Sequence, residues 1–116
     1  MERMKNNMYE ISKKDWKLFR EKLPGWQEKY MERLCKEYIA FLSAENEKAS
    51  EKFWELEKRI KVDKKRPGVI LEMRKSNAIY NIINLINDEV ITIDDLDGFS
   101  EELKDTVALL RVKIRY

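Results

Sequence analysis

Only five of the 116 residues are glycine or proline, and this scarcity constrains the fold more than any other feature of the sequence. Glycine and proline are the residues that most often interrupt regular structure, so a chain with few of them has few connections and long elements. Four of the five stand in two Pro-Gly pairs, Pro24-Gly25 and Pro67-Gly68. We therefore expect long helices that are divided at these two pairs.

Apolar residues recur every three or four positions along most of the chain, which is the spacing of one helical face. The first predicted helix covers about 12–23, with Ser12 as its cap. It ends before Pro24, because the residue before a proline avoids the helical conformation. A second predicted helix covers about 24–44, with the proline in its first turn. The polar residues 43–50, SAENEKAS, predict the connection that follows.

Two further helices are expected in the middle of the chain. The third covers about 48–65, where Glu55 and Arg59 stand one turn apart in the favourable acid-before-base order. The fourth covers about 67–87 and starts at the second proline. Its many aliphatic residues cover more than a narrow stripe, so we expect it to be the most central helix.

The segment near 88–99 is the least helical part of the sequence. Thr92 or Asp94 could cap a short turn that ends at Gly98. Ser100 then opens a last helix, with acidic residues in its first turn where the helix dipole favours them. The final residues, RVKIRY at 111–116, alternate in polarity and could form helix, strand or tail.

These patterns predict an all-α fold, a single compact bundle of four or five helices with a short irregular segment near 88–99. The bundle is expected to comprise residues 12–116, preceded by a flexible N-terminal arm at 1–11. The longest uninterrupted apolar run is YIAFL at 38–42, whereas a bilayer span needs about 20 such residues. The N-terminus also lacks the apolar core of a signal peptide. We therefore expect a cytoplasmic protein that makes no membrane contact.

The chain contains no histidine, which excludes a Ser-His-Asp or Cys-His catalytic system and any histidine metal site. The single cysteine, Cys35, is expected to be a small buried apolar residue of a helix. The acidic run at 94–98, DDLDG, does not fit a calcium loop. With Gly98 at the sixth loop position, Ile93 and Lys104 would occupy the first and last ligand positions. We expect no enzyme activity, no metal and no cofactor.

Three stretches of the chain resemble a family of short uncharacterised proteins from gut-type Gram-positive bacteria. They are residues 15–39, 52–76 and 85–107, and their most distinctive pieces read PGWQEKYMERL, FWELEKRI and DLDGFSEELK. The resemblance covers about 12–107. Members of that family often carry the label "multidrug transporter", which this sequence contradicts because no segment is long enough to cross a bilayer. The resemblance implies a compact domain that recurs among bacteria, and it supplies no catalytic motif.

The many aromatic residues favour a protein-binding function. The adjacent Phe53 and Trp54 cannot both point along one helical stripe, so one of them is either exposed or buried by a second neighbouring helix. Exposed aromatic residues are typical interface anchors. We expect a protein that acts through protein contacts, as a homodimer or with another protein, and that has no small-molecule ligand. The candidate anchors are Trp26, Tyr30, Trp54 and Tyr80.

Nucleic-acid binding is the alternative, because the charge is unevenly distributed. Residues 87–105 have a net charge of −7 and residues 106–116 of +3, which leaves +6 on residues 1–86. A basic cluster could neutralise several phosphates. The same cations could instead complete the end of a helix, with the acidic segment packed over them. The candidate nucleic-acid residues are Lys61, Lys64, Lys65, Arg66, Arg74 and Lys75.

Overall fold

The computed structural model describes residues 10–114. This part of the chain contains four α-helices and two short 3-10 helices, and it contains no strand, so the predicted all-α class is confirmed. None of its helices is long and apolar enough to cross a bilayer. The elements are α1 (Lys13–Ser43), α2 (Ala49–Asp63), η2 (Lys75–Asn77), α3 (Ala78–Asn87), η3 (Ile93–Leu96) and α4 (Glu101–Ile114).

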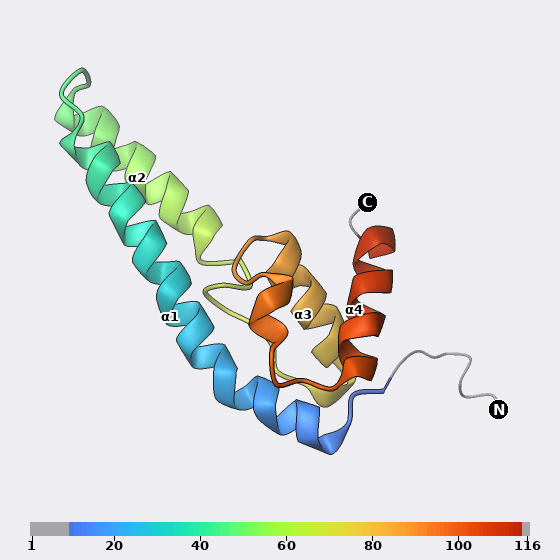
Figure 1. Ribbon diagram of the computed structural model, residues 1–116. Helices are drawn as coiled ribbons and strands as arrows, with labels where there is room; N and C mark the ends of the chain where they lie inside the picture. Colours follow the sequence, from blue (N-terminus) through green and yellow to red (C-terminus); the bar gives the residue numbers. More distant parts are fainter. Residues whose placement is uncertain (1–9, 115–116) are drawn as a thin grey trace.

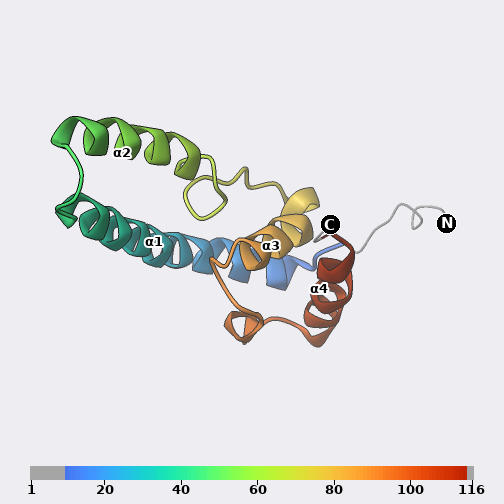
Figure 2. The same ribbon diagram turned by 90° about the horizontal axis from the view of Figure 1, so that it is seen from above.

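The helices form two parts that share α1 (Figure 1). The second half of α1 pairs with α2 in a helical hairpin that projects to the upper left of the figure; we call residues 31–63 the hairpin arm. The first half of α1 packs with α3, η3 and α4, and we call this part the body. Figure 2 shows α1 running through both parts. The molecule is correspondingly elongated, with principal extents of 61 × 26 × 21 Å.

The break expected at Pro24 does not occur, because α1 continues through the proline and joins the first two predicted helices into one. Pro24 removes the hydrogen bond to the carbonyl of Arg20, one turn earlier. Both residues are exposed, so water can bind that carbonyl. The apolar stripe keeps its phase across the proline, since Phe19, Leu23 and Tyr30 are all buried. Packing of this face outweighs the missing hydrogen bond.

The fourth predicted helix forms only in its second half, because α3 begins at Ala78. Residues 64–69 form turns, and residues 70–74 form neither helix nor strand, with Arg74 in an extended conformation. Within residues 70–74, Leu71 and Met73 pack against the core whereas the residues between and beside them are exposed. This alternation belongs to an extended chain, in which successive side chains point to opposite sides.

Contacts with α1 hold the turn at Pro67 and Gly68 in place. Gly68 is buried against the ring of Tyr30, so closely that even a methyl group on its Cα would overlap the ring. The side-chain amide of Gln27 donates a hydrogen bond to the carbonyl oxygen of Pro67 at 2.9 Å. These contacts between distant residues replace the helix that the local sequence favours.

The core lies in the body, between the first half of α1, α3 and α4. Seven of the ten residues of α3 are buried, so its predicted central position is confirmed. Leu103 and Val107 of α4 face it and are fully buried. Ile11 is also buried in this core, so the packed domain begins before residue 12, contrary to the predicted boundary. The remainder of the predicted flexible arm, residues 1–9, lies outside the described residues.

The starts of α1 and α4 are tied together by one buried carboxylate. Ser12 Oγ accepts a hydrogen bond from the backbone N–H of Asp15 at 3.1 Å, which confirms the predicted cap of α1. The Asp15 carboxylate accepts hydrogen bonds from the backbone N–H and the hydroxyl of Ser100, at 3.1 and 2.6 Å. Ser100 Oγ in turn accepts from the Leu103 N–H, as expected for the residue that opens the last helix.

The remaining local predictions can also be placed. Thr92 and Asp95 form a reciprocal capping box at the start of η3, within the irregular segment. The helix α4 extends to Ile114, so the first four residues of the ambiguous C-terminal run are helical. Residues 115–116 lie outside the described part of the chain.

Candidate interaction surface

The hairpin arm lacks a core of its own. No residue of α2 is buried, although a helix of this length is marginal in water without packing. Polar contacts join it to α1: the Lys52 ammonium donates to the carbonyl oxygens of Leu42 and of Ala44, the C-cap of α1. The Arg59 guanidinium lies 4.1 Å from the centroid of the Phe41 ring. Much of the apolar surface of the arm is therefore left in contact with water.

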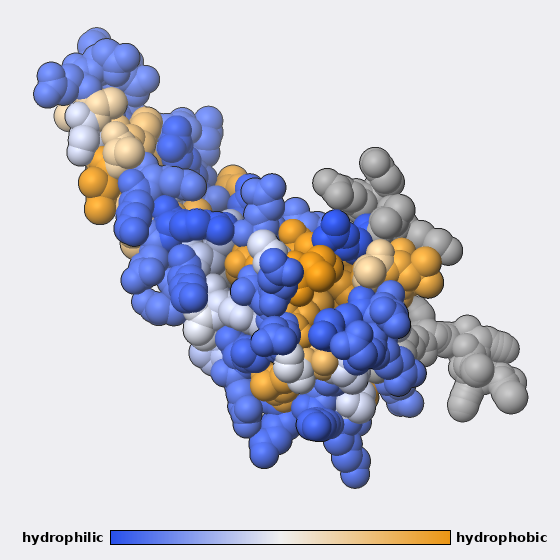
Figure 3. Space-filling model, viewed as in Figure 1, coloured by the Kyte–Doolittle hydropathy of each residue, from blue (hydrophilic) through white to orange (hydrophobic). Residues whose placement is uncertain are grey.

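Large apolar side chains are exposed along the arm. Phe53 and Trp54 are 62% and 64% exposed, and their rings meet edge to face with centroids 4.9 Å apart. Figure 3 shows apolar surface near the free end of the arm, surrounded by hydrophilic residues. An apolar patch with a polar rim is typical of a contact site. The other large apolar residues exposed on the arm are Ile39, Leu42, Ile60 and Val62.

Most of these residues lie on one side of the arm. Cys35, Ile39 and Leu42 follow one another at intervals of four and three residues and so form one stripe of α1. Phe53 and Ile60, seven residues apart, form one stripe of α2. Cys35 and Ile60 both line an open cavity of about 210 Å³ between the two helices, so the stripes adjoin. We call these five residues the arm face.

Two of the four predicted anchors are exposed and two are not. Trp54 lies at the edge of the arm face, beside Phe53, and Tyr80 is 55% exposed on α3 in the body. Trp26 is half-buried and stacks on Phe99, with ring centroids 6.4 Å apart, and Tyr30 is buried. Tyr30 is therefore part of the interior and Trp26 packs against the core, so neither offers the free surface of a contact residue.

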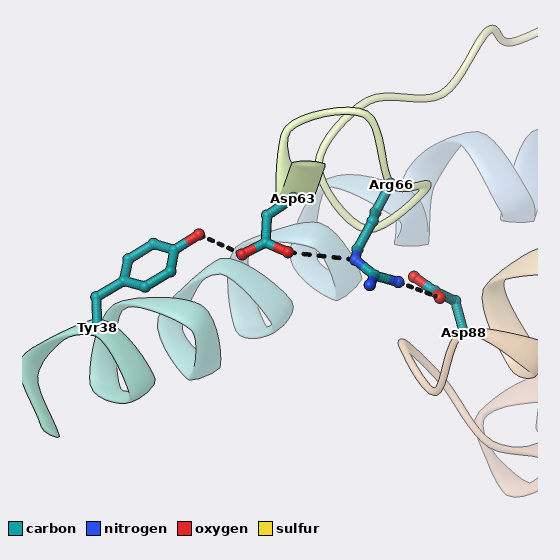
Figure 4. Close-up of polar contacts among 4 residues, drawn as sticks. All are labelled: Tyr38, Asp63, Arg66 and Asp88. Carbon is teal, nitrogen blue, oxygen red and sulfur yellow. Dashed lines mark hydrogen bonds and ion pairs between the residues drawn. The ribbon is translucent and has the colours of Figure 1, made fainter. Parts of the chain in front are cut away.

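A chain of four polar side chains joins the arm to the body (Figure 4). The Tyr38 hydroxyl donates to Asp63 Oδ2 at 2.5 Å. Arg66 donates from Nε to Asp63 Oδ1 at 3.3 Å and from Nη1 to Asp88 Oδ1 at 2.8 Å. These residues come from α1, the end of α2, the turn after it and the end of α3. We call them the polar joint.

The electrostatics of the polar joint are those of a structural contact. Burial, together with the hydrogen bond to Asp63, raises the pKa of the Tyr38 phenol, so the phenol remains a protonated donor. The Asp88 carboxylate raises the pKa of the Arg66 guanidinium, which two carboxylates neutralise. Neither residue can act as a base or nucleophile near neutral pH. Within residues 10–114, no group of three or more acidic or cysteine side chains is placed to hold a metal ion.

The six candidate nucleic-acid residues fall into two groups along the chain, 61–66 and 74–75. Arg66 is held in the polar joint, and Arg74 and Lys61 form ion pairs with neighbouring glutamates at 2.9 and 3.7 Å. Residues 70–74 also separate the two ends of the set, as the path from α2 to α3 in Figure 2 shows. The remaining candidates are exposed: Lys64, Lys65 and Lys75.

No protein-family model, curated protein or solved structure matches this chain. A fold can support many functions, so particular residues decide which function a protein has. In this chain the arm face and the polar joint are the two features that bear on function.

The sequence analysis named neither Ile39, Leu42 nor Ile60 as a contact residue, because apolar residues at helical spacing are most often core residues. Cys35 was expected to be buried in a helix. Cys35 is exposed, which corrects that prediction. No third helix covers this side of α1 in the described structure, so the residues that would have packed against it face water.

Proposed function

We propose that this chain is a non-enzymatic cytoplasmic protein that acts through protein contacts made by its hairpin arm, and that it self-associates. The observation that supports the proposal is the uncovered arm face on a helix pair in which α2 buries no residue. A protein partner would supply the packing that α2 lacks. Exposed aromatic residues such as Phe53 and Trp54 are the kind of side chain that anchors an interface.

The exposed area of Phe53 and Trp54 is large enough to form the centre of an interface. A phenylalanine or tryptophan side chain buries about 150–250 Å² when it is fully covered. Phe53 and Trp54 are nearly two-thirds exposed, so together they offer roughly 200–300 Å². A stable interface buries about 800 Å² per partner, so the pair can form its centre and the rest of the arm its remainder.

The polar joint supports this function indirectly. Tyr38 and Arg66 fix the end of α2 against α1 and α3, so the arm leaves the body in a defined direction. A surface that is held rigid before binding loses less conformational entropy when a partner covers it. The joint therefore favours contact by the arm without taking part in it.

The test is the molar mass in solution, measured by light scattering from low micromolar to near-millimolar concentration. We expect the mass of the wild-type chain to rise from monomer towards dimer. The double variant Phe53→Ser/Trp54→Ser should remain a monomer, because its apolar anchors are gone. Leu109→Ser is the matched control, since Leu109 is 63% exposed but lies on α4 in the body; it should dimerise like the wild type.

Two results would contradict the proposal. A wild-type chain that stays monomeric at the highest concentration does not self-associate. A Leu109→Ser variant that loses the dimer while Phe53→Ser/Trp54→Ser keeps it would place the contact on the body. Circular dichroism of all three proteins shows whether each variant keeps its helices, so that misfolding is not mistaken for lost contact.

A further inference from the structure

The charge of the arm changes sign along its length. Residues 45–57, from the connecting loop into the middle of α2, contain five carboxylates and two lysines. Residues 58–63, the second half of α2, contain three cations and one carboxylate, and the exposed Lys64 and Lys65 follow directly at the base of the arm. The free end of the arm is therefore acidic, and the end attached to the body is basic.

The apolar residues of α2 are centred on the same point. Phe53 and Ile60 are seven residues apart, and the midpoint between them falls between Leu56 and Glu57. The change in charge falls one residue later, between Glu57 and Lys58. A two-fold axis through this point would exchange Phe53 with Ile60 and the acidic half of α2 with its basic half.

We propose that the arm pairs with the same arm of a second copy in antiparallel orientation, so that the two hairpins form a four-helix bundle. This inference rests on the proposed self-association and adds the orientation of the pair. A two-fold interface brings the same patch of both copies together. In the antiparallel arrangement, the acidic free end of each arm lies against the basic base of the other, so the potentials are complementary at both ends.

The parallel alternative lacks this complementarity. Two arms packed free end to free end would place carboxylates such as Glu47 and Glu51 opposite the same carboxylates of the second copy. The basic residues at the two bases would likewise face one another, and like charges across an interface disfavour a pairing. In the antiparallel pair, by contrast, Phe53 of one copy packs on Ile60 of the other at both symmetry-related positions.

Spin labels on single cysteines can determine the orientation in the full-length protein. Cys35 is exposed and would itself take a label, so the background variant is Cys35→Ala, which keeps an apolar side chain at this position of the arm face. Light scattering of this background must first show the same mass as the wild type. One variant adds Glu47→Cys near the free end of the arm, and a second adds Glu57→Cys near the proposed axis. Both side chains are exposed, so labels there face water. The distance between the two labels of each dimer is then measured by pulsed electron paramagnetic resonance.

The antiparallel pair predicts a short distance at position 57 and a long one at position 47. The eight helical steps from Ala49 to Glu57 span about 12 Å, so the labels at position 47, which precedes α2, should be separated by at least roughly 24 Å along the axis of the pair. Adding Phe53→Ser to either variant should abolish the distance, because it removes the contact. Equal short distances at both positions would show a parallel dimer, which overturns this inference and leaves self-association intact. A missing distance together with a monomer mass would overturn both.

Discussion

The phenol of Tyr38 fastens α1 to the end of α2, and its proton is part of that contact. Burial and the hydrogen bond to Asp63 raise the pKa of the phenol above its ordinary value of about 10. The folded state therefore holds this proton more tightly than the unfolded state does. The resulting stabilisation is complete below about pH 10 and is lost as the pH rises towards the folded-state pKa. Burial also raises the pKa of Tyr30, which acts in the same direction.

This linkage predicts a difference between the wild type and Tyr38→Phe at alkaline pH. The free energy of unfolding of the wild type should fall more steeply above about pH 10, by up to about 1.4 kcal/mol per pH unit for one phenol proton. Urea unfolding between about pH 8 and pH 11.5 measures the slopes. Tyr80→Phe, in which the lost hydroxyl is on the exposed surface of α3, should keep the wild-type slope. Identical slopes for wild type and Tyr38→Phe would exclude the proposed linkage.

At the scale of single residues, the local contacts were predictable and the distant ones were not. Ser12, Thr92 and Ser100 each cap an element a few residues away, so their roles follow from the sequence around them. The bond between Asp15 and Ser100 joins residues 85 positions apart, and nothing in the neighbourhood of either residue specifies the other. The same applies to the contacts of Tyr38 with Asp63 and of Arg66 with Asp88 in the polar joint, whereas Asp63 and Arg66 are only three residues apart.

At the scale of elements, the two Pro-Gly pairs show that packing contacts can override the local sequence preference for a helix or a break. Both pairs predict a break, yet the first lies inside α1, and only the second lies in a stretch without helix, the eleven residues 64–74. The sequence does contain a signal for the first pair, since the stripe from Phe19 through Leu23 to Tyr30 keeps its phase across Pro24. It also contains a shorter one after the second, because apolar and charged residues alternate from Leu71 to Arg74. Each signal becomes decisive only once the packing partner is known.

Replacing each glycine by alanine should therefore have opposite effects. Gly25 has no neighbouring atom within 4 Å of the position of an added methyl group and lies in a helix, so Gly25→Ala should stabilise the fold by about 0.5–1 kcal/mol. Gly68→Ala should destabilise it by about 1–3 kcal/mol, because the methyl group overlaps the Tyr30 ring. Chemical unfolding measures both. In a Tyr30→Ala background the cost of Gly68→Ala should largely disappear; changes of equal sign at the two glycines would contradict this account.

At the scale of the whole molecule, the shape decides which residues can be functional. A compact bundle would place each helix against two neighbours and bury its apolar stripe. In the elongated structure, each helix of the arm has the other as its one described neighbour. The stripes that contain Ile39 and Phe53 are therefore exposed to water. The apolar pattern alone predicts that other side chains cover these residues. It does not say whether the cover comes from the same chain or from another.

The divided basic residues lead to a prediction about nucleic acids. Because Arg66 is neutralised and residues 70–74 separate the remaining cations, we expect no retention on immobilised duplex DNA at about 50 mM salt. Lys64→Glu/Lys65→Glu, which removes the two exposed lysines after α2, should behave like the wild type. Retention of the wild type at about 50 mM salt that disappears at about 200 mM and is lost in this variant would instead support nucleic-acid binding.

The hydrogen bonds between Asp15 and Ser100 also have a consequence for biosynthesis. A chain emerges from the ribosome N-terminus first, at about 5–20 residues per second. The Asp15 carboxylate is therefore made well before Ser100, which follows it by 85 residues, and cannot accept these hydrogen bonds until then. Until α4 follows, the core around Phe19 and Leu23 also lacks Leu103 and Val107, so the nascent body stays open.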